Sequence, residues 1–289
     1  MLFFVMTNDK ETSKVIQEII AAAKRGVNVH VAIDWISMYA NKSFKETNFA
    51  VREFRRSGVK VHLLGVHNIM FLGRNHCKWY IADDTIFSFG GINLNDTHLI
   101  DHSDYMLRID DNKFADILCR EQLKIERNNK RGRKVRGHSV KIGDDRILFD
   151  GSFYNSSLIY RRSIELAKEA DEILYVSQYH PTGQLSRVML DKNARTYANS
   201  PDLAYGPDTK LMISLSQKSS GQKNTYTRKR YIHAKFMIFT MPDGSKKALL
   251  GSHNFFKLTS IVGTREIDLE TSNPEIIAQL EKFFRDNIE

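Results

Sequence analysis

The strongest constraint on this chain is a histidine and a lysine, separated by one position, that occur twice in similar surroundings. The first pair is His76 and Lys78, and the second is His233 and Lys235. Apolar residues follow each pair, which is typical of a β-strand. Side chains alternate between the two faces of a strand, so each histidine shares a face with its lysine. One such pair arises easily by chance, whereas two copies indicate a duplicated unit.

Each pair is followed by a glycine, a small residue and an asparagine, and further on by a carboxylate. In the first copy these residues are Gly90, Gly91, Asn93 and Asp104, and in the second they are Gly251, Ser252, Asn254 and Glu266. The copies differ five residues after the lysine, where the first has Asp83 and the second has Thr240. The repetition therefore covers a whole set of polar residues.

This doubled pattern resembles the two-motif members of the phospholipase D superfamily. Their pattern is His-x-Lys-x4-Asp, then Gly-Ser-x-Asn, then an acidic residue. Asp104 stands where glutamate is more usual, and Thr240 stands where aspartate is expected. The resemblance covers nearly the whole chain, and the segment from Arg25 to Val29 is similar to the cardiolipin synthase branch in particular.

The resemblance implies an α/β fold of two pseudo-symmetric repeats, each a mixed β-sheet flanked by helices, with the active site at their interface. The residues agree with an α/β alternation. Apolar positions at helical spacing predict a helix over 13–24 and a second one ending at Gly58, and β-branched runs predict strands over 27–33 and 59–64. A helix is expected over 111–127. The basic run over 128–137 then breaks the apolar period, so we place the repeats at 1–130 and 131–289.

The second half predicts a helix up to Ala170, strands over 173–179 and 211–215, and a mobile surface loop over 216–230 that gates the site. In the first half the strand equivalent to 173–179 is Leu2 to Met6, and no helix precedes it. We therefore expect an edge or near-edge strand with exposed apolar surface, and a natural polypeptide that begins upstream.

Attack on a phosphodiester builds negative charge on phosphorus oxygens, which fixed cations and amide donors can stabilise. Neutral imidazole can attack phosphorus while a second, protonated imidazole gives its proton to the leaving alkoxide. A carboxylate can hold each imidazole by its other ring nitrogen. The residues assigned to catalysis are His76, Lys78, Asp83, His233, Lys235, Asp104 and Glu266, and those assigned to the substrate phosphate are Asn93, Asn254, Lys78 and Lys235.

Asp83 fits a turn at a strand end as well as it fits a catalytic role. Other histidines, such as His62, His67, His98 and His102, are expected to be surface or core residues, and His253 stays a candidate because of its place in the second Gly-Ser-x-Asn. By the resemblance, the histidine of the first copy attacks and that of the second protonates. The scheme needs no metal and no cofactor.

Composition narrows the setting. The chain has 289 residues, of which 42% are hydrophobic, enough for the cores of two ordinary domains. Its two cysteines, Cys77 and Cys119, suggest neither a disulfide framework nor a zinc site, which fits a reducing compartment. No apolar run approaches the length of a membrane span. We expect a cytoplasmic protein, peripheral at a membrane, and a monomer.

The formal charge of +9 is concentrated in two stretches. Residues 124–141 hold eight Lys and Arg against one Glu, and residues 218–235 hold six against none. Such stretches are either solvated faces or footprints for anionic lipid headgroups or nucleic-acid phosphates. The charge alone does not choose between these partners.

The function expected from the resemblance is phosphatidyl transfer or phospholipid cleavage of the cardiolipin synthase type. The alternatives are a metal-independent nuclease or nucleic-acid phosphodiesterase on the same fold, and a non-catalytic phosphate-binding module if Thr240 signals decay of the second half. A lipid enzyme should have an apolar rim beside the histidines, for which Phe71, Leu72, Phe255 and Phe256 are candidates, whereas a nuclease should have a continuous basic groove.

Overall fold

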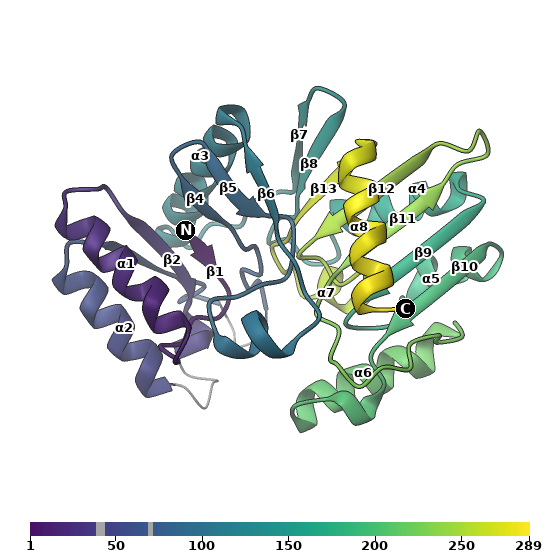
Figure 1. The fold of residues 1–289 in the computed structure, drawn as a ribbon, viewed down its shortest axis with the longest axis horizontal. Helices are drawn as coiled ribbons and strands as arrows, with labels where there is room; N and C mark the ends of the chain where they lie inside the picture. The colour runs from purple at the N-terminus through teal and green to yellow at the C-terminus, as the bar shows by residue number, and fades with distance from the viewer. Residues whose placement is uncertain (39–43, 69–71) are drawn as a thin grey trace.

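The computed structural model describes residues 1–38, 44–68 and 72–289, and the chain folds into a mixed α/β structure of sheets flanked by helices. The earlier elements lie on one side of the molecule and the later ones on the other (Figure 1). In the first part the elements are β1 (Leu2–Phe3), α1 (Thr12–Lys24), β2 (His30–Asp34), η1 (Trp35–Met38), α2 (Phe44–Arg56), β3 (Lys60–Leu64), β4 (Tyr80–Ala82), β5 (Thr85–Ser88), the π-helical turn η2 (Thr97–Asp101), β6 (Leu107–Asp110) and α3 (Asn112–Lys130).

The strands of this part form two three-stranded sheets, β1-β2-β3 and β4-β5-β6. The first is parallel and the second antiparallel. The backbone of Leu2 exchanges hydrogen bonds with that of Trp79 at 2.9 and 3.1 Å, which joins β1 to the start of β4. The strand order across both sheets is therefore β3-β2-β1-β4-β5-β6.

The prediction of an uncovered edge strand at Leu2 to Met6 was wrong. Strand β1 has a neighbour on each side, and Leu2, Phe3 and Met6 are fully buried. Phe3 and Met6 pack with residues of α1 and α2, whereas Leu2 belongs to the core that contacts α3. The expected covering helix would have preceded this strand in the sequence. Helices that follow it, α1, α2 and α3, cover it instead.

The later elements build one larger sheet. They are β7 (His138–Ile142), β8 (Asp145–Phe149), α4 (Leu158–Glu169), β9 (Glu172–Ser177), α5 (Gly183–Leu190), β10 (Asn193–Ala198), η3 (Pro201–Leu203), α6 (Pro207–Ser220), β11 (Phe236–Thr240), β12 (Lys246–Gly251), α7 (Lys257–Ile261), β13 (Ile267–Thr271) and α8 (Pro274–Asn287). The strand order is β10-β9-β11-β12-β13-β8-β7, with only β10 and β9 parallel.

The two parts share a pattern of pairing. In each, a central strand has a parallel neighbour on one side (β2 on β1, β10 on β9), and on the other an antiparallel neighbour that follows the His/Lys pair (β4, β11). Two further antiparallel strands, β5 and β6, follow in the first part, and four, β12, β13, β8 and β7, follow in the second. This correspondence supports two repeats, and the boundary near residue 130, in the connection between α3 and β7, stays a prediction.

One apolar core runs through both parts. It contains Leu2, Trp79 and Phe89 from the first part, together with Ile232 and Phe236 from the second. Burial of large apolar side chains is the main favourable term in folding, so this shared core holds the two sheets in a fixed relation. The polar residues that follow the two His/Lys pairs are thereby brought face to face.

The segment around α6 departs from its prediction. Residues 211–215, expected as a strand, lie within helix α6, which Pro207 begins at a favoured first-turn position and Gly221 ends in the left-handed conformation. The supposed mobile loop begins inside this helix. Ser220 is buried and its carbonyl accepts from Ser186 Oγ, so removal of residues 219–223 would cost packed structure, contrary to the expectation for a free gate.

Candidate active site

His76 lies in extended backbone just before β4, and its partner comes from the other end of the chain. The Nδ1 atom of His76 is 2.9 Å from Oε2 of Glu266, which directly precedes β13. The same oxygen accepts a 2.5 Å hydrogen bond from Ser252 Oγ. The histidine backbone is fixed as well, because His76 N–H donates to the carbonyl of Arg265 at 2.8 Å.

His233 lies in extended backbone before β11, and its partner comes from the first part. Its Nδ1 is 2.7 Å from Oδ2 of Asp104. The other oxygen of this carboxylate accepts from the backbone N–H groups of Gly91 and Tyr105 at 3.1 and 2.9 Å. The expected pairing of each imidazole with a carboxylate is thus present, and the two parts exchange carboxylates. Each pair crosses the interface.

Lys78 and Lys235 are fully buried beside these pairs. Nζ of Lys78 donates to the carbonyl of His76 at 2.6 Å, and Nζ of Lys235 donates to the carbonyl of His233 and lies 3.2 Å from its Nδ1. Burial lowers the pKa of Lys78 to about 7 and that of Lys235 to about 8. Near neutral pH each lysine is therefore close to the point at which it gains or loses its proton. An arriving phosphate anion favours the charged form.

Burial lowers the pKa of both histidines, and it does so more strongly at His233. After burial, the ammonium of Lys235 is the main group that disfavours a second positive charge on His233, whereas Glu266 opposes the shift at His76. The two carboxylates also differ in the direction of their pKa shifts. Burial raises the pKa of Asp104, while at Glu266 the attraction of His76 outweighs burial and lowers it.

The close packing around position 91 requires a glycine there. A Cβ atom there would lie 2.6 Å from Oδ2 of Asp104 and 2.7 Å from Nδ1 of His233, so no side chain fits. The equivalent Ser252 instead uses its hydroxyl to hold Glu266. The shorter aspartate reaches its histidine by lying against the bare backbone of Gly91, and the longer glutamate leaves room for a serine.

The two asparagines both line the pocket between the histidines. Oδ1 of Asn93 accepts from the backbone N–H groups of Phe4 and Val5 at 3.2 and 3.1 Å, and its Nδ2 lies 3.4 Å from Nδ1 of His98. The side chain of Asn254 is buried, and its Oδ1 has no hydrogen-bond partner in the described part of the chain. Both amide side chains therefore border the space between the two histidines.

The catalytic role predicted for Asp83 is corrected by its position. Asp83 is exposed in the turn between β4 and β5 and has a φ of 54°. Six residues of the chain lie between it and His76, and it borders a different cavity. Thr240 ends β11 at the equivalent hairpin. The copies therefore differ at a strand end, where aspartate tolerates the left-handed conformation, and not in the site.

A pocket of about 580 Å³ contains His76, His233, both asparagines and Glu266, and we call it the histidine pocket. Its apolar lining comes from Phe4, Val5, Leu211, Met212, Phe256, Leu258 and Val262. Of the rim residues expected from the sequence, Phe256 lines the pocket. Phe255 is fully buried in the core of the second part instead, and Leu72 is not among the lining residues. Phe71 lies outside the described residues.

Sequence reasoning missed two histidines beside the site. The ring of His98 contacts that of His233 edge-on, with centroids 4.2 Å apart, and it lines the histidine pocket. His102 packs behind both rings, and both of its ring nitrogens are buried with no hydrogen-bond partner among the described residues. No periodicity marked these residues. By contrast, His253 is fully buried, accepts from Phe255 N–H and packs behind the site.

Two groups of side chains, among the residues described, have ligand atoms close enough to share a cation. His98, His102 and His233 form one, and His30, His62 and Glu126 form the other, each with its ligand atoms within 4.8 Å of one another. In the first group Nδ1 of His233 is already held by Asp104. The expectation of a metal-independent reaction stays a prediction.

Residues 1–124 match the family model described as "Cardiolipin synthase, PLD-like domain". Over these residues the chain is similar to the phospholipase D superfamily. Cardiolipin synthase B of Salmonella typhi and that of Salmonella typhimurium are each 30% identical to it over 122 residues. The match covers 40% of this chain and only 29% of those relatives.

A solved structure extends the likeness to the second part. The polyphosphate kinase of Porphyromonas gingivalis matches 97% of this chain and 41% of its own, with a TM-score of 0.62 and 14% identity. At this identity the likeness concerns the fold alone. It includes the elements after residue 124, which the family model does not reach.

Proposed function

We propose that the chain catalyses phosphodiester hydrolysis or transfer through a phosphohistidine. The observation that carries this proposal is the crossed pair of contacts, His76 with Glu266 and His233 with Asp104, around one pocket. Each carboxylate occupies Nδ1, so each Nε2 is left for chemistry. A phosphate-binding module without catalysis would have no use for two oriented imidazoles.

The reaction follows from these groups. Nε2 of one neutral histidine attacks phosphorus, the bond from phosphorus to the leaving oxygen breaks, and the other histidine, protonated, gives its proton to that oxygen. The second histidine, now neutral, removes a proton from water or an acceptor alcohol, whose oxygen attacks phosphorus and breaks the P–N bond. Lys78, Lys235 and the amides of Asn93 and Asn254 stabilise the negative charge on the phosphorus oxygens.

A phospholipid is the substrate class that we favour. Apolar side chains from both parts line the histidine pocket, and Leu211 on α6 is 58% exposed at its border. Acyl chains or the glycerol backbone can contact such a lining, whereas nucleic acid calls for cationic and stacking residues. The family model and the names of the bacterial relatives support the same choice. We also propose association with anionic membranes, and no helix of the described residues has the length and hydropathy needed to cross a bilayer.

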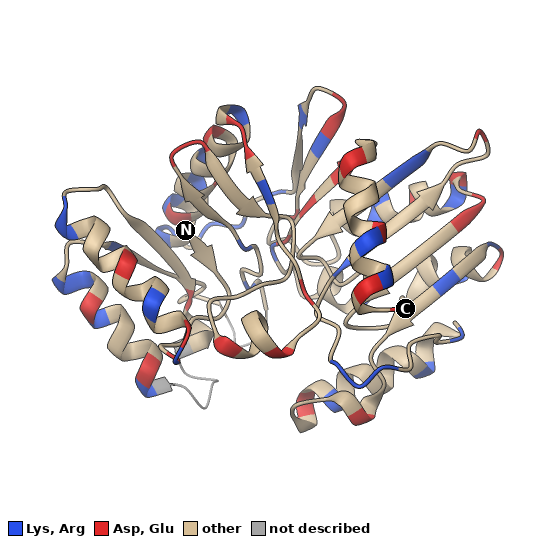
Figure 2. Cartoon of the chain, in the orientation of Figure 1, with Lys and Arg blue, Asp and Glu red and all other residues tan. Residues whose placement is uncertain are grey.

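A nuclease is the second candidate because of the basic connection after α3. Arg131, Arg133, Lys134 and Arg136 are exposed there. Across the molecule, however, Lys and Arg are interspersed with Asp and Glu (Figure 2). In the second basic stretch, Arg228 donates to carbonyls at the end of α8, and Arg230 donates to those of Ile100 and Asp101. These two arginines have structural partners and contribute less to a phosphate footprint.

The deciding experiment offers the same enzyme two substrates in the presence of a chelator. One is vesicles that contain phosphatidylglycerol, and the other is single-stranded DNA. We expect lipid products only, and none from a His76→Asn variant. Cleavage of DNA with intact lipid would establish the second candidate, and no turnover of either substrate would reject phosphodiester catalysis on both.

A further inference from the structure

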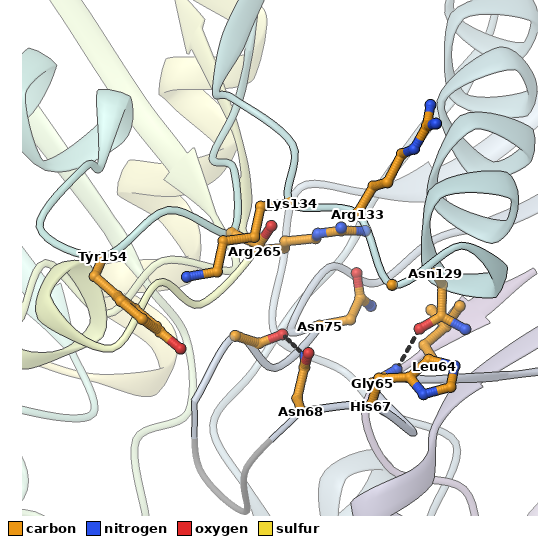
Figure 3. A pocket seen from close by; sticks show the side chains of 13 residues that line it. Leu64, Gly65, His67, Asn68, Asn75, Asn129, Arg133, Lys134, Tyr154 and Arg265 are labelled. Atoms are coloured by element: carbon orange, nitrogen blue, oxygen red, sulfur yellow. Dashed lines mark hydrogen bonds between the residues drawn. The ribbon is translucent and has the colours of Figure 1, made fainter.

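A second cavity lies behind the candidate active site. Its volume is about 210 Å³, and Figure 3 shows the residues that surround it. The walls come from the turn after β3, the connection between α3 and β7, and Arg265. We call it the arginine cavity.

One wall, made of two neighbouring chain segments, separates the arginine cavity from the histidine pocket. Asn75 bridges to Arg265, with His76 N–H donating to the Arg265 carbonyl and Arg265 N–H to the Arg74 carbonyl, both at 2.8 Å. Along these extended segments the side chains alternate. Asn75 and Arg265 border the arginine cavity, while His76 and Glu266 border the histidine pocket.

The cavity is rich in donors and has no carboxylate among its described lining residues. The side chain of Arg265 is 8% exposed and makes no ion pair with a described residue; its Nε lacks a hydrogen-bond partner. Both amide atoms of Asn75 are likewise buried without a partner. In Figure 3 the Asn75 amide lies beneath the Arg265 guanidinium, and the Lys134 side chain extends toward the Tyr154 ring, with Nζ 3.5 Å from the ring centroid; both residues also line the cavity.

The carboxylates near Arg265 already have other partners. Asp34 binds Arg74 at 3.0 Å and the Asn75 backbone N–H at 2.8 Å, and Glu121 pairs with Lys124 and His138. A buried cation without a partner is costly, and burial lowers the pKa of Arg265. An anion in the cavity would remove this cost. A planar guanidinium with an amide and an ammonium nearby matches a tetrahedral oxyanion.

We propose that the arginine cavity binds a phosphate-class anion through Arg265, Asn75 and Lys134, separately from the phosphodiester that reacts. The anion would be free phosphate or the phosphomonoester of a small headgroup such as glycerol phosphate. It would contact the rear of the wall that carries His76 and Glu266 without touching the substrate. The assignment does not depend on the proposed function, because it rests on the cavity alone.

Calorimetric titration with inorganic phosphate at constant ionic strength tests the proposal. Phosphate can also bind between the catalytic lysines. The parent protein for the test is therefore Lys78→Met/Lys235→Met, which lacks that second binding site. We expect this parent to retain one phosphate site and Arg265→Gln in the same background to weaken it at least about tenfold. A parallel titration with glycerol 3-phosphate identifies the source, since the tighter ligand is the natural class.

Two neighbouring substitutions supply the controls. Lys134→Gln should weaken phosphate binding about threefold, whereas Arg131→Gln, in the same connection but outside the cavity lining, should leave it unchanged. In phosphate-free buffer, Arg265→Gln should melt no lower than its parent, because Arg265 has no internal ion pair to lose. Three results would each overturn the proposal. The first is no phosphate binding by the Lys78→Met/Lys235→Met parent, and the second is equal effects of Lys134→Gln and Arg131→Gln. The third is a large fall in Tm on substitution of Arg265.

Discussion

The two histidine–carboxylate pairs occupy equivalent positions in the two parts of the chain, yet they are built differently. His76 is held by a glutamate that a serine hydroxyl steadies, and His233 by an aspartate that two backbone N–H groups steady. His233 also has Lys235 Nζ 3.2 Å from its Nδ1 and His98 against its ring. Similar motifs therefore give two imidazoles with unequal tendencies to carry a proton, which a reaction with one nucleophile and one acid requires.

The sharpest test of this inequality is removal of each imidazole. Both His76→Asn and His233→Asn should lower kcat for an ordinary substrate by about 10⁴-fold or more. With a p-nitrophenol leaving group, which needs little proton donation, His233→Asn should still form a covalent adduct and His76→Asn should not. Acid-quenched capture of labelled phosphohistidine measures this.

A label retained in His76→Asn and lost in His233→Asn would reverse the roles. The physical basis for such a reversal exists, because burial and Lys235 lower the pKa of His233 more strongly than the surroundings lower that of His76. Asp83, which the first motif has and the second lacks, gives His76 no advantage, because it is an exposed turn residue.

The supports of the carboxylates give the next largest contrast. Gly91→Ser should lower kcat about 10²-fold to 10³-fold, because the new Cβ would displace Asp104 and His233, and a displacement of about 1 Å is costly in catalysis. Ser252→Ala removes one hydrogen bond to Glu266 and should cost about tenfold or less. Steady-state kinetics on both variants, with circular dichroism to establish folding, makes the comparison. Equal losses would show that the two supports are equivalent.

The buried lysines predict a pH dependence. A lysine carries its charge below its pKa, which burial lowers to about 7 for Lys78 and to about 8 for Lys235. As pH rises through these values the ammonium groups become neutral, so kcat/KM for an anionic substrate should fall by about tenfold or more between about pH 7 and pH 9. In Lys78→Met the remaining fall should centre on the higher value. A profile of kcat/KM that rises over this range in the unmodified protein would contradict the assignment.

The smallest expected effect concerns the exposed basic connection. Neutralising Arg131, Arg133, Lys134 and Arg136 together should weaken binding to anionic vesicles by roughly tenfold at low salt and by less at physiological salt, because exposed charges act through screened attraction. Vesicle co-sedimentation across a salt series measures it. Unchanged affinity at every salt concentration would leave the apolar border of the histidine pocket as the membrane contact.

The sequence by itself determined the local elements and the inventory of chemical groups. Apolar spacing placed α1, and Gly58, which has a positive φ, follows the end of the second helix as expected. The doubled His/Lys motif identified both imidazoles, both lysines and both carboxylates of the candidate site. These features depend on near neighbours in the chain, which a sequence displays directly.

Only the tertiary structure decided which groups meet. The exchange of Asp104 and Glu266 between the parts, the central place of β1 and the gathering of His98 and His102 around His233 all depend on how the two sheets pack. The same holds for Arg265, which reads as one more basic residue in the sequence and is a buried cation in the fold. Contacts between residues far apart in the chain arise from packing of a shared core, and no local period records them.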